Sequence, residues 1–83
     1  MFLKVIFKSL SMRKQADLMK RRGIVLGTRN KDGRQGYLYM LNNIFAEIFY
    51  VNDNPGLGAE RLIVLDGLEK LTRHLEKDLR LSR

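Results

Sequence analysis

The sequence predicts a single α+β domain over residues 1–83: a four-stranded antiparallel β-meander with a C-terminal amphipathic helix on one face, and an N-terminal helix. Three observations indicate this fold class. The 83 residues suffice for one domain, and 45% of them are apolar, above the range of disordered chains. Short segments rich in β-branched and aromatic residues alternate with turn signals in the middle of the chain. Apolar residues recur at helical spacing on both sides of that region.

The N-terminal apolar segment, residues 1–8, fits two kinds of secondary structure. Its sequence is Met-Phe-Leu-Lys-Val-Ile-Phe-Lys, which suits a strand with Leu3, Val5 and Phe7 on one side as well as it suits a helix. The segment is too short to span a membrane and has no small-residue cleavage pattern after it. Packing against the domain core is favoured over a peripheral membrane anchor, because apolar stripes usually face a core.

A helix is predicted for residues 9–22. Ser9 or Ser11 can cap its N-terminus. Gly23 follows the last predicted turn and suits the left-handed residue that often ends a helix. The apolar residues of the helix recur at the expected spacing: Met12, Ala16 and Met19.

The antiparallel sheet is predicted for residues 24–65. Asp32-Gly33 and Asn42-Asn43 are turn signals, because these residues tolerate the positive φ of tight hairpins. The segment 52–58 contains Pro, two Gly and two Asn and is expected to be a loop. The predicted strands are 24–29, 37–41, 44–51 and 61–65.

The two turn signals define a register in which both faces of the sheet are largely apolar. The face that contains Tyr37, Tyr39 and Ile48 is expected to pack under the last helix. A solvated face would show polar residues, so the second face is also expected to be covered, by the first helix, a second copy or a ligand. That second face includes Arg29, Met40, Phe45, Glu47 and Phe49.

The last helix is predicted for residues 66–81. Asp66 and Glu69 are spaced like a capping box, with Asp in the Ser/Thr place. His74 lies off the apolar stripe of this helix and is expected in solvent. The stripe consists of Leu68, Leu71, Leu75 and Leu79.

No motif for catalysis or metal binding is present. The chain contains one His and no Cys, and it lacks HExxH, GxSxG and P-loop sequences. A catalytic His needs an acid or a nucleophile within hydrogen-bond reach, and none is indicated by the spacing. The sequence therefore predicts no catalytic residue, no metal ligand and no cofactor, and a non-catalytic binding module. Absence of Cys is compatible with a cytoplasmic location, which we expect.

Positive charge is concentrated in the first half of the chain. Residues 1–36 contain ten Lys and Arg against two Asp, whereas residues 37–83 contain six bases against seven acids. A segregated excess creates a local field that attracts polyanions or an acidic partner. The bases predicted to pair with phosphates are Lys20, Arg21, Arg22, Arg29, Lys31 and Arg34.

Two functional hypotheses follow from these features. The first is a cytoplasmic homodimer that binds nucleic acid, single-stranded or without sequence preference, through its basic half. The alternative is a homo-oligomeric protein–protein interaction module with an acidic partner. A dimer is expected because a small domain with a second apolar face gains burial by pairing. Met40, Phe45 and Phe49 are the candidates for that dimer face, or for a platform on which unpaired bases stack.

Overall fold

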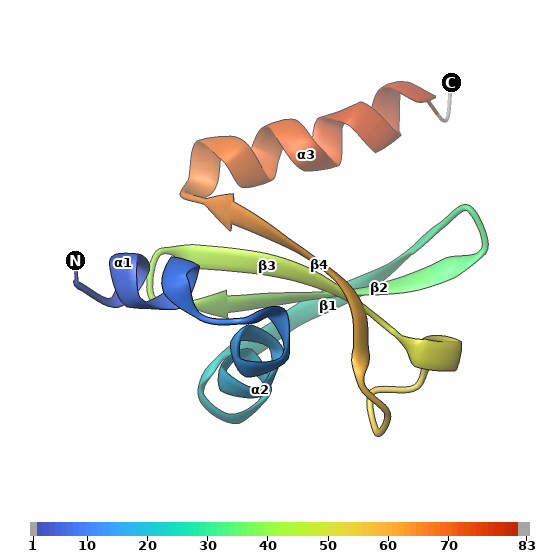
Figure 1. Cartoon of the computed structure of the whole chain (residues 1–83). Coiled ribbons are helices and arrows are strands. Elements are labelled where there is room, and N and C mark those ends of the chain that lie inside the picture. Colours follow the sequence, from blue (N-terminus) through green and yellow to red (C-terminus); the bar gives the residue numbers. More distant parts are fainter. Residues whose placement is uncertain (1, 82–83) are drawn as a thin grey trace.

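Four antiparallel strands lie side by side in chain order, with helices on both faces of the sheet (Figure 1). The computed structural model describes residues 2–81, and the side chains of residues 4–76. It confirms the predicted α+β class. The helices are α1 (Phe2–Ser9), α2 (Met12–Arg22) and α3 (Leu68–Leu81). The strands are β1 (Ile24–Lys31), β2 (Arg34–Leu41), β3 (Ile44–Tyr50) and β4 (Ala59–Asp66), and a short 3-10 turn, η1 (Val51–Asp53), follows β3.

The N-terminal apolar segment is helical and is followed at once by α2. Ser11 caps α2, because its hydroxyl accepts a hydrogen bond from the backbone N–H of Lys14 at 3.3 Å. The expectation that Gly23 adopts a left-handed conformation is wrong: its φ is −83°. Glycine is required there for a different reason, since a Cβ atom would lie 2.7 Å from the carbonyl oxygen of Met19.

Both predicted hairpin turns are present. Asp32 and Gly33 have φ values of 53° and 79°, and Asn42 has a φ of 53°. These positive values match the residue types, because Asp, Asn and Gly tolerate the left-handed region best. The turns therefore set the pairing of β1 with β2 and of β2 with β3.

A β-bulge near the start of β1 changes the predicted register. Val25 pairs with Tyr39 and Gly27 pairs with Leu38, so that Leu26 is the extra residue. Residues 24 and 25 consequently face the sides of the sheet opposite to those predicted. The residue types of β1 do not indicate the bulge, because the apolar residues of this strand alternate equally well in either register.

Helices α1 and α2 cover one face of the sheet, and α3 covers the other (Figure 1). The prediction that the last helix packs on the face of Tyr37 and Tyr39 is therefore wrong. Because both faces are apolar, hydrophobicity alone did not assign a helix to a face. The core under α1 and α2 consists of Phe7, Ala16, Met19, Tyr39, Ile44, Ala46, Ile48 and Tyr50.

The opposite core lies beneath α3. Leu71 of α3 is buried against Phe45 and Leu65, with Leu75 packed beside them. Leu68, at the start of the predicted stripe, is 65% exposed, and the side chain of Leu79 lies outside the described residues. The central part of the stripe thus provides the contact with the sheet.

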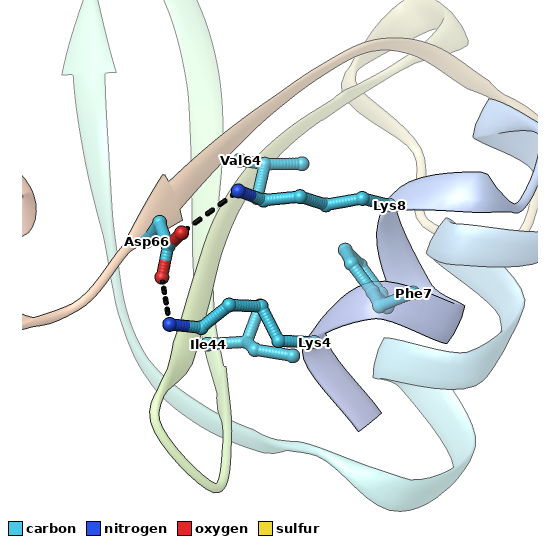
Figure 2. Close-up of a pocket in the computed structure, with 6 residues that line it drawn as sticks. All are labelled: Lys4, Phe7, Lys8, Ile44, Val64 and Asp66. Atoms are coloured by element: carbon cyan, nitrogen blue, oxygen red, sulfur yellow. Dashed lines mark hydrogen bonds and ion pairs between the residues drawn. The ribbon is translucent and has the colours of Figure 1, made fainter. Parts of the chain in front are cut away.

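An ion-pair cluster joins α1 to the end of β4 (Figure 2). The carboxylate of Asp66 accepts hydrogen bonds from Lys8 Nζ at 2.8 Å and Lys4 Nζ at 2.9 Å, and the buried ring of Phe7 lies between the two lysine side chains in Figure 2. The hydrogen bonds of Lys8 and then Lys4 lower the pKa of Asp66 to about 2. The prediction that this carboxylate caps the last helix is wrong, because the helix begins at Leu68 and the carboxylate is turned towards α1.

We predict that Asp66→Asn destabilises the protein at neutral pH but not in strong acid. A carboxyl group whose folded pKa is about 2, below its ordinary value of 3.8, stabilises the fold above pH 3.8, and this contribution disappears as the pH falls towards 2. Thermal melting should show a lower midpoint for the variant at pH 7 and a converging midpoint between pH 4 and pH 2. Asp17→Asn, which removes an exposed pair with Arg21, is the control. A constant difference across this pH range would contradict the role of the cluster.

Candidate nucleic-acid interface

Arg29, one of the six predicted phosphate-binding bases, lies in an internal charged cluster. Its Nε donates to Oε2 of Glu47 at 2.5 Å and its Nη2 donates to Oε1 at 2.7 Å. The side chain of Arg29 is 18% exposed and that of Glu47 is fully buried. Such a two-point pair satisfies the carboxylate, so the guanidinium is engaged inside the fold rather than offered to a phosphate.

Gly36 gives this pair the space it needs. Gly36 lies in β2 between Arg29 of β1 and Phe49 of β3. A Cβ atom at position 36 would lie 2.6 Å from Oε2 of Glu47. The missing side chain therefore lets a residue of β1 reach across β2 to a carboxylate of β3.

His74 completes the cluster from α3. Its Nε2 lies 2.8 Å from Oε1 of Glu47 and 2.8 Å from Nη2 of Arg29. An ionised carboxylate can only accept and a guanidinium can only donate, so we assign the Nε2 proton to the bond with Glu47, and the contact with Arg29 Nη2 is not a bond that this proton makes. The side chain of His74 is 14% exposed. The expectation that this histidine is solvated is therefore wrong. Its partner Glu47 lies on a strand, so the spacing of residues along the helix did not indicate the pair.

The ionisation of Glu47 depends on these two partners. Desolvation by burial has the largest single effect and raises the pKa of Glu47. The hydrogen bonds and charges of Arg29 and His74 together outweigh it, so that the pKa of this buried carboxyl is below its ordinary value. Glu47 is therefore a carboxylate held between the sheet and α3.

The other predicted bases are distributed over two separate regions. Lys20, Arg21 and Arg22 are exposed on α2, whereas Lys31 and Arg34 belong to the β1–β2 hairpin. Figure 1 shows that the tip of this hairpin extends away from α2. The structure does not bring the six residues together at one site.

The exposed side of α2 contains two bases that the sequence reasoning did not select. Arg13 and Lys14 are exposed two helical turns before Lys20 and Arg21, at i, i+7 spacing. Asp17 is the acid between the two pairs of bases. Asp17 pairs with Arg21 at 2.7 Å. The i, i+7 spacing was the signal that could have identified these residues. We call this surface the basic face of α2: Arg13, Lys14, Lys20, Arg21 and Arg22.

A small cleft separates α2 from the loop between β3 and β4. Lys20 spans it, because its Nζ donates to the carbonyl oxygen of Pro55 at 2.6 Å and lies 5.4 Å from the ring centroid of Tyr50. The cleft has a volume of about 130 Å³. Tyr50 is 1% exposed and its hydroxyl is 2.7 Å from that of Tyr39, so the ring is part of the core and not a free stacking surface.

Arg34 is held by acids at the end of the sheet. Its Nε donates to Asp53 at 3.0 Å, and its Nη2 donates to Glu60 at 2.5 Å and to the carbonyl oxygen of Tyr50 at 3.0 Å. Arg34 also lines a larger groove together with Lys31. The hairpin therefore differs from the basic face of α2, because its Arg34 is paired with two carboxylates from other segments.

The predicted dimer or stacking face is covered within the single chain. Phe45 and Phe49 are each 6% exposed. Phe45 lies beneath α3, and Met40 packs against the same cluster. The reason is the placement of α3, which occupies the face that was expected to be covered by the first helix, a second copy or a ligand.

Neither a metal centre nor a membrane span is found among the described residues. No three His, Cys, Asp or Glu side chains in this part of the chain are grouped as metal ligands would be. None of the described helices is long and apolar enough to cross a membrane.

Comparison with known proteins adds no further assignment. No family model, no curated protein and no solved structure matches the chain. The interpretation of its surfaces therefore depends on their geometry and charge.

We predict that Arg29→Met destabilises the protein by about 3–5 kcal/mol, because it leaves the buried Glu47 carboxylate without its main partner. His74→Ala should cost about 1.5–3 kcal/mol, the range for a hydrogen bond to a charged group. Urea denaturation at pH 7 measures both. Arg73→Met, which removes an exposed pair with Glu69 on the same helix, should change the free energy of unfolding by less than about 1 kcal/mol. Equal effects of the three substitutions would show that the buried cluster is not a stabilising element.

Proposed function

We propose that this chain is a small non-catalytic module that binds nucleic acid, single-stranded or without sequence preference, along the basic face of α2. The observation that supports the proposal is the concentration of five exposed bases and one acid on a single helix of 11 residues. Such a helix is about 16 Å long, so its side chains can contact successive phosphates of one strand. The proposed contacts position the backbone and do not distinguish one base from another.

The arrangement of the aromatic residues supports backbone recognition over base stacking. Phe45, Phe49 and Tyr50 are buried, each with at most 6% of its surface exposed. Stacking of unpaired bases needs an accessible ring face. Binding along α2 is therefore proposed to be mainly electrostatic, with an affinity that decreases as salt increases.

Of the six bases first predicted, three remain in this proposal. Lys20, Arg21 and Arg22 belong to the basic face of α2, and Arg13 and Lys14 extend it towards the N-terminus of the helix. Arg29 is excluded because its guanidinium is engaged by Glu47.

We predict that Lys14→Gln with Arg22→Gln weakens binding of single-stranded DNA and RNA to a similar extent for all sequences. Both residues are exposed, so the free energy of unfolding should not change. The slope of the logarithm of affinity against the logarithm of salt should decrease by about 0.7 for each phosphate that the variant no longer neutralises. Fluorescence anisotropy at several salt concentrations measures affinity and slope.

The matched control changes the same amount of charge on another helix. Lys70→Gln with Arg73→Gln removes two exposed bases from α3 and should leave both affinity and slope close to those of the parent protein. If the two double variants lose affinity equally, net charge and not the basic face of α2 is responsible. If the parent protein binds no oligonucleotide at low salt, the proposal fails.

A second candidate function, self-association, is favoured by one feature of β1. This strand is at the edge of the sheet, and Ile24, Val25 and Leu26 are 60%, 54% and 46% exposed. An edge strand with exposed apolar side chains offers unpaired backbone groups to another strand. The proposed homodimer thus uses β1 in place of the face that α3 covers.

We predict that Val25→Lys with Leu26→Lys abolishes this association. Light scattering at micromolar concentration should give a dimer for the parent protein and a 9.7 kDa monomer for the variant. Leu57→Lys, an exposed apolar position in the loop before β4 (43% exposed), should remain dimeric. A parent protein that is monomeric under these conditions would exclude the β1 dimer.

A further inference from the structure

A groove of about 380 Å³ lies beside the β1–β2 hairpin. This volume is within the range of about 300–1,000 Å³ that is usual for small-molecule sites. The basic face of α2 contributes no residue to it. Its lining residues come from the hairpin, β3 and β4: Lys31, Asp32, Arg34, Phe49, Glu60 and Arg61.

Arg34 is the best-positioned cation of the groove. Three of its five N–H groups are used, because Nε donates to Asp53, and Nη2 donates to Glu60 and to the carbonyl oxygen of Tyr50. Its Nη1 makes no hydrogen bond within the part of the chain that the structure describes. These bonds order the side chain before any ligand binds, which reduces the entropy lost on binding. A planar guanidinium with two remaining donors suits an oxygen-rich anion.

The other charged residues that line the groove indicate which kind of anion it binds. Arg61 is exposed and Lys31 is half-buried, and both add positive charge to the wall. Asp32 and Glu60 also line the groove, and their oxygens accept hydrogen bonds but repel a bare anion. The lining therefore fits a ligand that combines an anionic group with hydroxyl or amino donors, above the largely buried ring of Phe49.

We infer that this groove binds a nucleoside monophosphate. Arg34 and Arg61 contact the phosphate, and the ribose hydroxyls or the amino group of the base donate to Asp32 or Glu60. The groove is independent of the basic face of α2, and only the choice of a nucleotide as the phosphate ester rests on the proposed function. The ligand is either a free nucleotide or the 5′-terminal nucleotide of a strand, and the two present the same chemistry to the groove.

Isothermal titration with adenosine and uridine 5′-monophosphates tests the inference. Both nucleotides should bind, while adenosine and inorganic phosphate, each of which has only part of the required chemistry, should bind at least about tenfold more weakly. Arg61→Gln should weaken nucleotide binding about tenfold, since it removes one charge-assisted contact. Arg73→Gln, which removes the same charge from an exposed position on α3, should leave it unchanged.

Several results would overturn the inference: saturation by neither nucleotide, inorganic phosphate binding as tightly as the nucleotides, or equal losses in Arg61→Gln and Arg73→Gln. Failure of the groove is distinguishable from failure of the proposed function. Oligonucleotide binding that is sensitive to Lys14→Gln with Arg22→Gln, without mononucleotide binding, refutes only the groove. Mononucleotide binding without oligonucleotide binding refutes only the interface on α2.

A competition experiment identifies the source of the nucleotide. A 5′-phosphorylated oligonucleotide that displaces adenosine 5′-monophosphate better than its 5′-hydroxyl counterpart assigns the groove to the end of a strand. Equal displacement by the two oligonucleotides, with mononucleotide binding still sensitive to Arg61→Gln, assigns it to a free nucleotide.

Discussion

The buried carboxylate of Glu47 constrains more of this structure than any other single group. It lies at the centre of β3, is fully buried, and is kept ionised by Arg29 of β1 and His74 of α3. A charge in that position is stable only when its partners are present in the right geometry. The requirement links the edge strand, the central strand and the C-terminal helix, and it also explains the glycine at position 36, where a Cβ atom would collide with the carboxylate. The face of the sheet under α3 is thus part apolar core and part charged cluster.

Ion pairing divides the positive charge of the chain into bases that join distant segments and bases that do not. Arg29 neutralises Glu47, Arg34 is held by Asp53 and Glu60, and Lys4 and Lys8 pair with Asp66. Each of these pairs joins segments far apart in the sequence, so much of the N-terminal excess of charge serves the fold. The basic face of α2 remains as a group of exposed bases with one acid among them. This division is the reason that the proposed interface is a helix and not the whole basic half of the chain.

The surfaces left by the fold differ in chemistry. The basic face of α2 is exposed and charged, β1 exposes a short apolar edge, and the groove beside the hairpin combines cations with carboxylates. An exposed charged helix suits a flexible polyanion, an apolar edge suits another strand, and a concave mixed site suits a small ligand. In a domain with so small a core, all three are built on elements that the two apolar clusters hold in place.

Local patterns determined the elements of this protein, and tertiary contacts determined how they are used. The turn residues Asp32-Gly33 and Asn42-Asn43, the helical spacing in α2 and the leucine stripe of α3 were sufficient to predict the order of the elements from α2 onwards, because each is a short-range property of the backbone. The first eight residues fitted a strand as well as a helix, and only the fold showed that they form α1. The face on which α3 packs was not predictable, since both faces of the sheet are apolar. The roles of Arg29, Glu47 and His74 were hidden for a related reason: a charged residue on an apolar face has the same appearance in sequence whether it is solvated or paired. Only the folded chain, which brings together residues 29, 47 and 74, decides that they form a buried cluster.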